Sequence, residues 1–193
     1  MKRPVNIALL CGAAAVILSC IIMLNLLKND TTMEILTGTY GGKIYRYSFD
    51  TESLEFTLLE KVGAENASYA IKDAGNIYAV SETGDASGAY SFSVGSQTAM
   101  TADKRQTGAD PCFIMKYDDR ILTADYSGGS VTVFPLIEGS LGDSIQKLDF
   151  QGNGPVEGRQ ESSHIHQLKT IPMTDWILAS DLGADKIRLL RFE

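Results

Sequence analysis

The stretch ILTADYSGGSVTVFPL (residues 121–136) decides the fold, because it reads as a strand, a glycine turn and a second strand. Residues 131–134 alternate with the two-residue period of a half-buried strand. Gly128 and Gly129 lie between the strands, where glycine permits the tight turn that joins antiparallel neighbours. The stretch therefore predicts a β-hairpin.

The same strand-turn-strand pattern recurs along the chain. The first strands of the pattern are IYAVSE (77–82), ILTADY (121–126) and ILASDL (177–182). The second strands are AYSFSV (89–94), SVTVFPL (130–136) and KIRLLRF (186–192), and KIYRYSFD (43–50) opens the series with a partial copy. A further short strand precedes each pair, in SYAIK (68–72), CFIMK (112–116) and HIHQLK (164–169).

Each repeat contains three or four predicted strands, and successive repeats start 44 and 56 residues apart. This period fits the blades of a β-propeller, which use about 40–45 residues for four strands. A sandwich or open meander has the same alternation, but it does not explain so long a period. We therefore expect an all-β chain of four-stranded antiparallel propeller blades.

The N-terminal segment is apolar and uncharged from Ile7 to Leu27, which is long enough for one helical span of a bilayer. Lys2 and Arg3 precede this span and favour a cytoplasmic N-terminus with a translocated body. We expect residues 1–30 to form an apolar helix that serves as a membrane anchor or signal segment. Residues 33–193 would then form an extracytoplasmic, periplasmic-side propeller body.

Three alternatives for this segment stay open. Cys20 follows a small residue, as in a lipoprotein cleavage box, and is therefore a candidate for lipidation. The segment also has features of a cleaved signal peptide. If translation starts at Met33, the body is cytoplasmic.

Charge and cysteine content exclude two classes of function. Lys2, Arg3 and Lys28 account for three of the 17 basic residues, so after residue 28 the 24 acidic side chains outnumber the basic ones by ten. Such a surface repels phosphate backbones, and no nucleic-acid partner is expected. Only Cys112 lies in the body, which excludes an internal disulfide framework and a cysteine-rich zinc site.

The motifs taken together resemble the lactonase family of seven-bladed β-propellers. The resemblance rests on GTYGGKIYRYSFD (38–50), NASYAI (66–71), IYAVSE (77–82), DPCFIMKYDDRILTADYSGGSVTVFPL (110–136), GPVEGRQESSHIHQL (154–168) and WILASDLGADKIRLLRFE (176–193). It implies about three and a half of seven blades, so a second chain is a candidate for completing the propeller. Where the family usually has histidine, this chain has Phe113.

The resemblance also implies an activity that needs no cofactor. The family hydrolyses sugar lactones, and 6-phosphogluconolactone, converted to 6-phosphogluconate, is the leading substrate. Phosphorylated sugars are cytoplasmic, however, which conflicts with a translocated body. The alternative function is a non-catalytic extracytoplasmic propeller that binds a ligand or a partner protein.

The segment RQESSHIHQL (159–168) carries the candidate chemistry. A regular strand places alternate residues on opposite faces. We therefore expect one face to carry His164, His166 and Leu168, and the other to carry Ser163, Ile165 and Gln167. Imidazoles can accept a proton from water near neutral pH, as opening a lactone requires.

The resemblance places this segment beside the central channel and implies a catalytic histidine there. His166 is slightly favoured over His164, and a purely structural histidine pair is the alternative. Arg159 is a candidate catalytic donor to the developing oxyanion, and Gln160 is a candidate substrate-binding donor.

Further candidate substrate-binding residues lie at the ends of the repeated strands. They are Glu82, Asp125, Tyr126 and Asp181. We expect the three carboxylates to occupy matching repeat positions, where they either line the channel rim or accept hydrogen bonds from the following turn. His-x-His is also a metal-ligand spacing, which Glu161, Glu82 or Asp181 could complete, but the chain has no third ligand at motif spacing, so no metal is expected.

Overall fold

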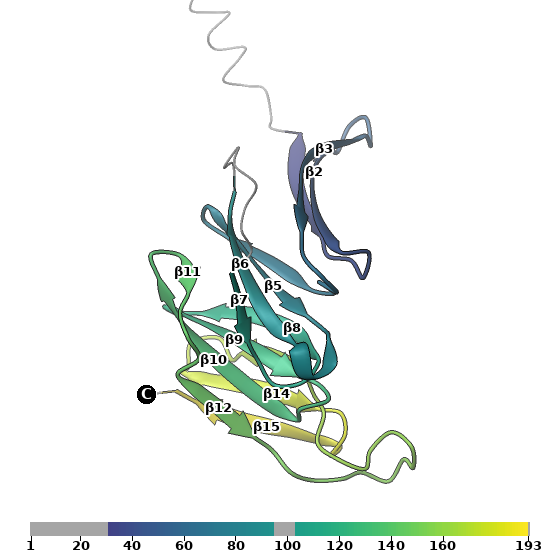
Figure 1. Cartoon of the computed structure of the whole chain (residues 1–193), viewed down its shortest axis with the longest axis vertical. Helices are drawn as coiled ribbons and strands as arrows, with labels where there is room; N and C mark the ends of the chain where they lie inside the picture. Colours follow the sequence, from purple (N-terminus) through teal and green to yellow (C-terminus); the bar gives the residue numbers. More distant parts are fainter. Residues whose placement is uncertain (1–30, 95–102, 193) are drawn as a thin grey trace, which may run out of the picture. The chain divides into compact units, whose positions relative to one another are not determined.

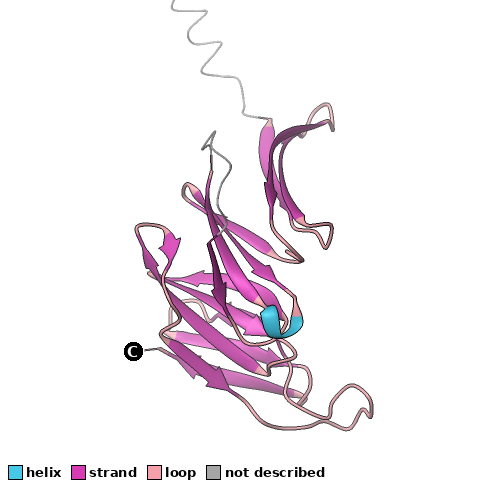
Figure 2. Cartoon of the chain, in the orientation of Figure 1, coloured by secondary structure: helices cyan, strands magenta, loops and turns pink. Residues whose placement is uncertain are grey.

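The computed structural model describes residues 31–94 and 103–192, whose regular secondary structure is almost entirely β-strand, joined by turns and loops (Figure 2). A single turn of 3₁₀ helix, Gly84–Ala86, interrupts the strands of this described part. Within these two ranges, no helix is long and apolar enough to cross a membrane. The predicted apolar helix of residues 1–30, including Cys20, lies outside the described residues.

The strands form four antiparallel sheets that follow one another along the chain (Figure 1). The first sheet contains β1 (Thr32–Thr37), β2 (Lys43–Asp50) and β3 (Phe56–Gly63). The second contains β4 (Ala70–Asp73), β5 (Asn76–Ser81), β6 (Gly88–Ser93) and β7 (Asp103–Gln106). The third contains β8 (Pro111–Tyr117), β9 (Arg120–Asp125), β10 (Ser130–Ile137), β11 (Ser140–Leu141) and β12 (Gln146–Asp149). The fourth contains β13 (Ile165–Thr170), β14 (Trp176–Asp181) and β15 (Lys186–Arg191).

By internal contacts the chain divides into two compact units. The described part of the smaller unit, residues 31–33 and 49–56, is a turn organised by Asp50. Its carboxylate accepts hydrogen bonds from the backbone N–H groups of Glu52 and Ser53, both at 2.9 Å, and from the Thr31 hydroxyl at 3.2 Å. The larger unit, residues 34–48 and 57–193, contains all the residues of the site described below.

The hairpin predicted for residues 121–136 is confirmed as β9 and β10, with Thr123 opposite Thr132 and Ala124 opposite Val131. The expectation that β10 is half-buried is wrong, because all four residues from Val131 to Phe134 are buried. The valines pack against the fourth sheet, and Phe134 packs against the second. Both faces of this strand are therefore covered.

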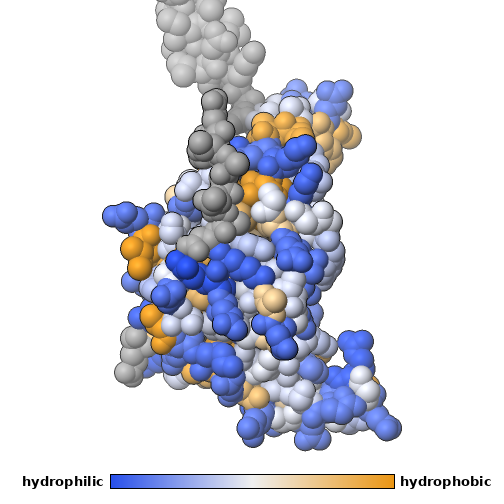
Figure 3. Space-filling view, in the orientation of Figure 1, coloured by the Kyte–Doolittle hydropathy of each residue, from blue (hydrophilic) through white to orange (hydrophobic). Residues whose placement is uncertain are grey.

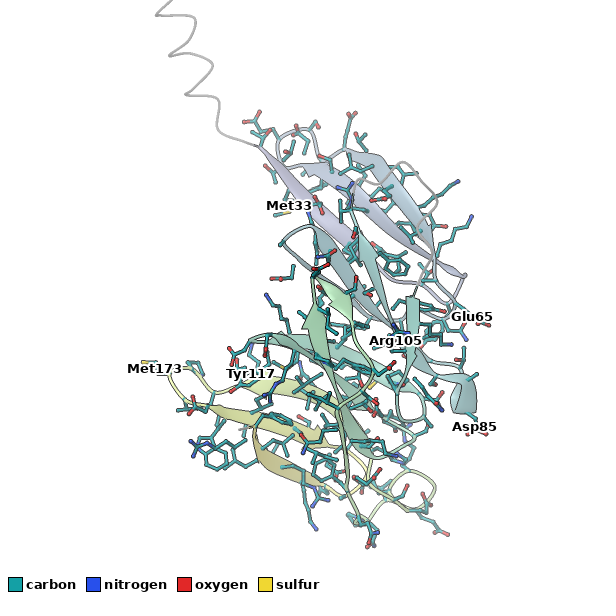
Figure 4. The ribbon with its side chains drawn as sticks, turned by 60° about the vertical axis from the view of Figure 1, so that its left-hand side comes forward. Met33, Glu65, Asp85, Arg105, Tyr117 and Met173 are labelled. Carbon is teal, nitrogen blue, oxygen red and sulfur yellow. The ribbon has the colours of Figure 1, made fainter. Side chains whose placement is uncertain are left out.

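Apolar layers form between each pair of consecutive sheets in the larger unit. Residues such as Ile44 and Ile77 join the first and second sheets, and Tyr78 and Ile121 join the second and third. Leu122 and Ile177 join the third and fourth sheets, where the ring of Tyr117 (Figure 4) also lies 6.2 Å from that of Phe192. The sheets thus bury apolar side chains face to face, and each layer adds to stability in proportion to the apolar area removed from water.

Outer strands were the ones that the repeat pattern did not reveal. They are β3, β7 and β12; the sequences DKRQ of β7 and QKLD of β12 are mostly polar, whereas β3, FTLLEKVG, exposes Phe56, Leu58 and Leu59. Polar side chains are expected at sheet edges, where they discourage pairing with other chains. Polar residues also cover most of the face seen in Figure 3. The four-strand prediction is confirmed for the second sheet, whereas the first and fourth sheets have three strands and the third has five.

Candidate functional site

A β-bulge at the start of β13 changes the expected arrangement of the histidines. Ile165 pairs with Asp181 and Gln167 pairs with Ser180, which leaves His166 as the extra residue. Ile165 and Leu168 are both buried, whereas His166 and Gln167 are both exposed. The prediction that His164, His166 and Leu168 share one face is therefore wrong, because the extra residue breaks the two-residue period.

One backbone hydrogen bond recurs in three sheets and aligns their residues. It runs from the N–H of Glu82 to the carbonyl of Asn66, from Tyr126 to Asp110, and from Leu182 to His164, over 2.8 to 3.1 Å. The residues two positions after these acceptors are therefore equivalent in the repeat. They are Ser68, Cys112 and His166. β8 also has a bulge at Cys112, because Pro111 pairs with Asp125 and Phe113 with Ala124.

The tautomer of His164 follows from its hydrogen bond. Its Nδ1 lies 2.9 Å from the carbonyl oxygen of Tyr126. A carbonyl can only accept, so Nδ1–H is the donor and the neutral ring keeps its lone pair on Nε2. The ring also stacks on that of Tyr126, with centroids 4.4 Å apart and planes 5° from parallel.

His166 approaches the same tyrosine from its edge. The two ring centroids are 5.9 Å apart and the planes are 82° from parallel. We call Tyr126, His164 and His166 the histidine cluster. The structure thus brings together three of the residues that the sequence singled out.

Asp181 fixes the backbone of His164 from within the protein. Its buried carboxylate accepts hydrogen bonds from the His164 N–H at 2.9 Å, the Ser163 hydroxyl at 2.7 Å and the Ala184 N–H at 3.0 Å. Arg188 adds two more donors, since its Nη2 and Nε both donate to Oδ2 of Asp181, at 2.8 and 3.0 Å. Burial acts to raise the pKa of Asp181, but these hydrogen bonds outweigh it and hold that pKa below its usual value.

Asp125 occupies the matching position in the third sheet but forms no ion pair within residues 31–94 and 103–192. It accepts hydrogen bonds from Thr123, Ser130 and Thr132 at 2.6 to 2.8 Å, and from the Gly108 N–H at 3.1 Å. Burial raises its pKa although these donors oppose the rise. Asp125 and Asp181 thus have the structural role of accepting hydrogen bonds from neighbouring segments, and not that of lining the channel rim. Direct contact with a substrate would require them to lose these hydrogen bonds.

Glu82 lies one residue beyond the position expected for it. β5 ends at Ser81, and the recurring backbone hydrogen bond aligns Glu82 with Tyr126 rather than with Asp125. The expectation that the three carboxylates match is therefore wrong for Glu82. Its partly exposed carboxylate accepts one hydrogen bond from the Tyr40 hydroxyl, at 2.9 Å, and another from the Ser68 hydroxyl.

We call Tyr40, Ser68 and Glu82 the carboxylate cluster. The sequence reasoning missed Tyr40 and Ser68. A signal for Tyr40 existed, because it follows ILTGT (35–39) in the first repeat as Glu82 follows IYAVS (77–81) in the second.

Cys112 contacts the backbone of the histidine cluster. Its thiol is 3.4 Å from the carbonyl oxygen of His166, and the charge of Glu82 acts on it. Burial, with the Glu82 charge as the second cause, raises the pKa of Cys112 to about 12. The group is therefore a neutral thiol near pH 7 and is not an activated nucleophile.

The remaining predicted donors lie on the loop before β13. Gln160 stabilises that loop, because its side chain donates to the Leu182 carbonyl at 2.7 Å and accepts from the Val156 N–H at 3.0 Å. Arg159 is exposed on the same loop. Phe113, which stands where the family has histidine, packs its ring 4.8 Å from that of Tyr69. In residues 31–94 and 103–192, no group of three or more His, Cys, Asp or Glu side chains is placed to hold a metal ion.

Consecutive antiparallel sheets with shared apolar layers, and with polar residues gathered at their strand ends, define a protein of the β-propeller class. A family model described as "Lactonase, 7-bladed beta-propeller" matches residues 34–193. The chain therefore belongs to this lactonase family, as the sequence motifs predicted.

Relatives of known name agree with this placement. The chain is 32% identical over 165 residues to the 6-phosphogluconolactonase of Bacillus subtilis, covering 78% of this chain and 46% of that protein. A crystal structure of a candidate 6-phosphogluconolactonase from Bacteroides fragilis superposes with a TM-score of 0.80 at 32% identity, over 86% of this chain and 50% of the other. The periplasmic gluconolactonase of Pseudomonas aeruginosa gives a TM-score of 0.72 at 27% identity, over 83% and 50%. The chain thus spans about half the length of the relatives it matches.

Proposed function

We propose that the protein hydrolyses a sugar lactone at the histidine cluster. 6-Phosphogluconolactone, which yields 6-phosphogluconate, is the leading substrate, and unphosphorylated gluconolactone is the second. The names of the Bacillus and Pseudomonas relatives support these two choices. The sequence identity to these two relatives, 32% and 27%, supports lactone hydrolysis as the class of reaction more strongly than it supports either substrate.

In the proposed reaction, His164 acts as the general base. A water molecule attacks the lactone carbonyl carbon while its proton passes to Nε2 of His164. The tetrahedral intermediate then expels the ring oxygen, which takes the proton from the imidazolium and becomes a hydroxyl group. The products are one carboxylic acid and a regenerated neutral histidine, with no co-reactant beyond water.

The observation that carries this proposal is the hydrogen bond from His164 Nδ1–H to the Tyr126 carbonyl. It leaves Nε2 as the acceptor, which is the form that a general base requires. His166, slightly favoured from the sequence, is more exposed and packs edge-on against Tyr126. We therefore assign the proton transfer to His164 and a supporting role in substrate contact to His166.

Arg159 is the proposed donor to the developing oxyanion. Gln160, the other candidate, already donates its side-chain N–H to the Leu182 carbonyl. The guanidinium of Arg159 lies on an exposed loop and can form charge-assisted hydrogen bonds. A membrane-anchored, periplasmic-side location and a second chain that completes the propeller also remain part of the proposal, and both rest on the sequence argument alone.

The test is lactone hydrolysis by the full chain, followed by acid release at constant pH. We expect turnover of D-glucono-δ-lactone or its 6-phosphate above the uncatalysed rate. His164→Ala combined with His166→Ala should abolish that turnover. Hydrolysis that survives the loss of both histidines would contradict the assignment.

A non-catalytic propeller that binds a ligand or partner protein is the second candidate. Phe113 favours it, because an aromatic ring packed against Tyr69 stands where the family has histidine. This candidate predicts that the wild-type chain gives no hydrolysis, whereas a lactone analogue still binds.

A further inference from the structure

The carboxylate cluster and the proposed catalytic histidines occupy equivalent ends of the repeat. Ser68 and His166 occupy the same position in the second and fourth repeats, and Cys112 occupies that position in the third repeat. The Cys112 thiol contacts the His166 carbonyl and is influenced by the charge of Glu82. The two clusters therefore lie at equivalent places of the repeat, and each includes a side chain accessible to solvent, since Tyr40 is 65% exposed and His166 is also exposed.

The Glu82 carboxylate is held in one orientation by two donors from different repeats. The Tyr40 hydroxyl binds Oε2, and the Ser68 hydroxyl binds Oε1. Its backbone is fixed as well, because the Asn66 side chain donates to the Glu82 carbonyl at 2.9 Å while the Glu82 N–H donates to the Asn66 carbonyl. Each carboxylate oxygen can accept more than one hydrogen bond, so acceptor sites remain on both oxygens.

A fixed carboxylate with spare acceptor sites suits a ligand that offers hydroxyl donors. The ring hydroxyls of a sugar lactone are such donors, and hydrogen bonds to a charged acceptor are stronger than those to a neutral one. An anionic group would be repelled from the same place. The cluster is therefore suited to the neutral, hydroxylated part of a sugar.

We propose that Tyr40, Ser68 and Glu82 form the hydroxyl-recognition half of the site, which selects polyhydroxylated lactones over plain ones. Glu82 contacts the sugar hydroxyls, and Tyr40 and Ser68 are positioning residues that hold its carboxylate. This inference rests on the proposed lactone hydrolysis for its substrate class. It adds the orientation of the substrate, with the hydroxyls toward Glu82 and any phosphate directed away from it.

The test compares two lactones that differ in their hydroxyl groups, using the full chain. D-Glucono-δ-lactone carries ring hydroxyls, and δ-valerolactone has the same ring without them. We expect Glu82→Gln to raise KM for the first by about tenfold or more, since one to two charge-assisted hydrogen bonds are weakened, and to leave KM for the second unchanged. Tyr40→Phe and Ser68→Ala should give smaller increases in the same direction. Glu65→Gln is the matched control, because Glu65 (Figure 4) is exposed on the turn before β4 and is not part of the carboxylate cluster.

Two outcomes would overturn the inference: equal effects of Glu82→Gln on both lactones, or no effect on either. If neither lactone is hydrolysed, the proposed function fails, and binding then tests the inference separately. Calorimetry with D-glucono-δ-lactam and δ-valerolactam, which resist hydrolysis, should show that only the hydroxylated lactam binds and that Glu82→Gln weakens it about tenfold or more. Failure of wild-type protein to prefer the hydroxylated lactam would overturn the hydroxyl-recognition role.

Discussion

The histidine cluster and the carboxylate cluster occupy matching positions of the repeat, yet they are held in place by different means. Asp181 accepts the backbone N–H of His164 from the buried side and is itself held by four further hydrogen bonds, two of them from Arg188. The matching residue behind Glu82 is Ser81, whose buried hydroxyl has no hydrogen-bond partner in the described ranges. Glu82 is held instead by the side chains of Tyr40 and Ser68.

This difference shows how one repeat supports two kinds of chemistry. A general base needs a fixed tautomer and position, which a buried network supplies. A recognition carboxylate needs a fixed direction but also contact with solvent, which surface hydroxyls allow. The comparison therefore predicts that buried substitutions affect the histidine cluster strongly and the carboxylate cluster weakly.

The largest expected effect is on catalysis and separates the two histidines. His164→Gln removes the base and should lower kcat by about 10²-fold or more, the usual contribution of a positioned general base. His166→Gln should lower kcat/KM by about tenfold or less, because His166 makes contact without transferring the proton. Steady-state rates with D-glucono-δ-lactone measure both. The reverse order would transfer the base role to His166.

The next effect is on stability and compares the buried residues behind each cluster. Asp181→Asn leaves the partly buried Arg188 without its counter-charge, and should lower the free energy of unfolding by about 2 to 4 kcal/mol. Ser81→Ala removes a hydroxyl that has no partner among the described residues, so we expect a change within about 0.5 kcal/mol. Urea unfolding followed by circular dichroism measures both changes. Equal decreases in the free energy of unfolding for Asp181→Asn and Ser81→Ala would contradict the proposed difference between the two clusters.

A smaller loss is expected where the backbone passes close to His164. A Cβ on Gly183 would overlap the Ser162 carbonyl oxygen and lie 2.7 Å from His164 Cδ2, so Gly183→Ala should cost about 1 to 3 kcal/mol and reduce lactone turnover. Gly75→Ala is the control, since nothing lies within 4 Å of its added Cβ and its φ is not positive. Full turnover in Gly183→Ala would mean that the position of His164 is not critical.

The smallest effect is a pH dependence of opposite sign for the two buried aspartates. The folded-state pKa of Asp181 is lowered, so its stabilisation is present above the unfolded value of about 4 and is lost as the pH falls through the folded pKa. The pKa of Asp125 is raised, so its contribution is present below about pH 4 and is lost as the pH rises through the folded pKa.

Urea midpoints between pH 3 and pH 7 therefore distinguish the two residues. The deficit of Asp181→Asn should shrink toward acid, whereas Asp125→Asn should gain stability relative to wild type toward neutral pH. Parallel curves for the two variants would contradict the assigned directions.

Much of the fold was predictable because central strands carry strong local signals. Alternation and glycine turns located β5, β9, β10 and β14 to within a residue or two. The outer strands β7 and β12 were missed because their short, mostly polar sequences resemble loops. The bulge at His166 could not be predicted, since a bulge is defined by the pairing of two strands and not by the sequence of one.

The site was predictable only in part for a similar reason. Tyr126, His164 and His166 each stand in a motif that the sequence singled out, although Tyr126 and His164 are 38 residues apart. Tyr40 and Glu82 meet across 42 residues, through a contact that no local motif encodes. The buried state of Asp125 and Asp181 likewise depends on donors from neighbouring segments, such as Gly108 and Ser163.

The most direct test of the central claim is ¹⁵N NMR of the histidine side chains, recorded with and without D-glucono-δ-lactam. We predict that His164 carries its proton on Nδ1, as the bond to the Tyr126 carbonyl requires, and that its Nε2 resonance shifts when the lactam binds. An Nε2-protonated His164, or lactam binding that leaves both histidines unchanged, would contradict the account.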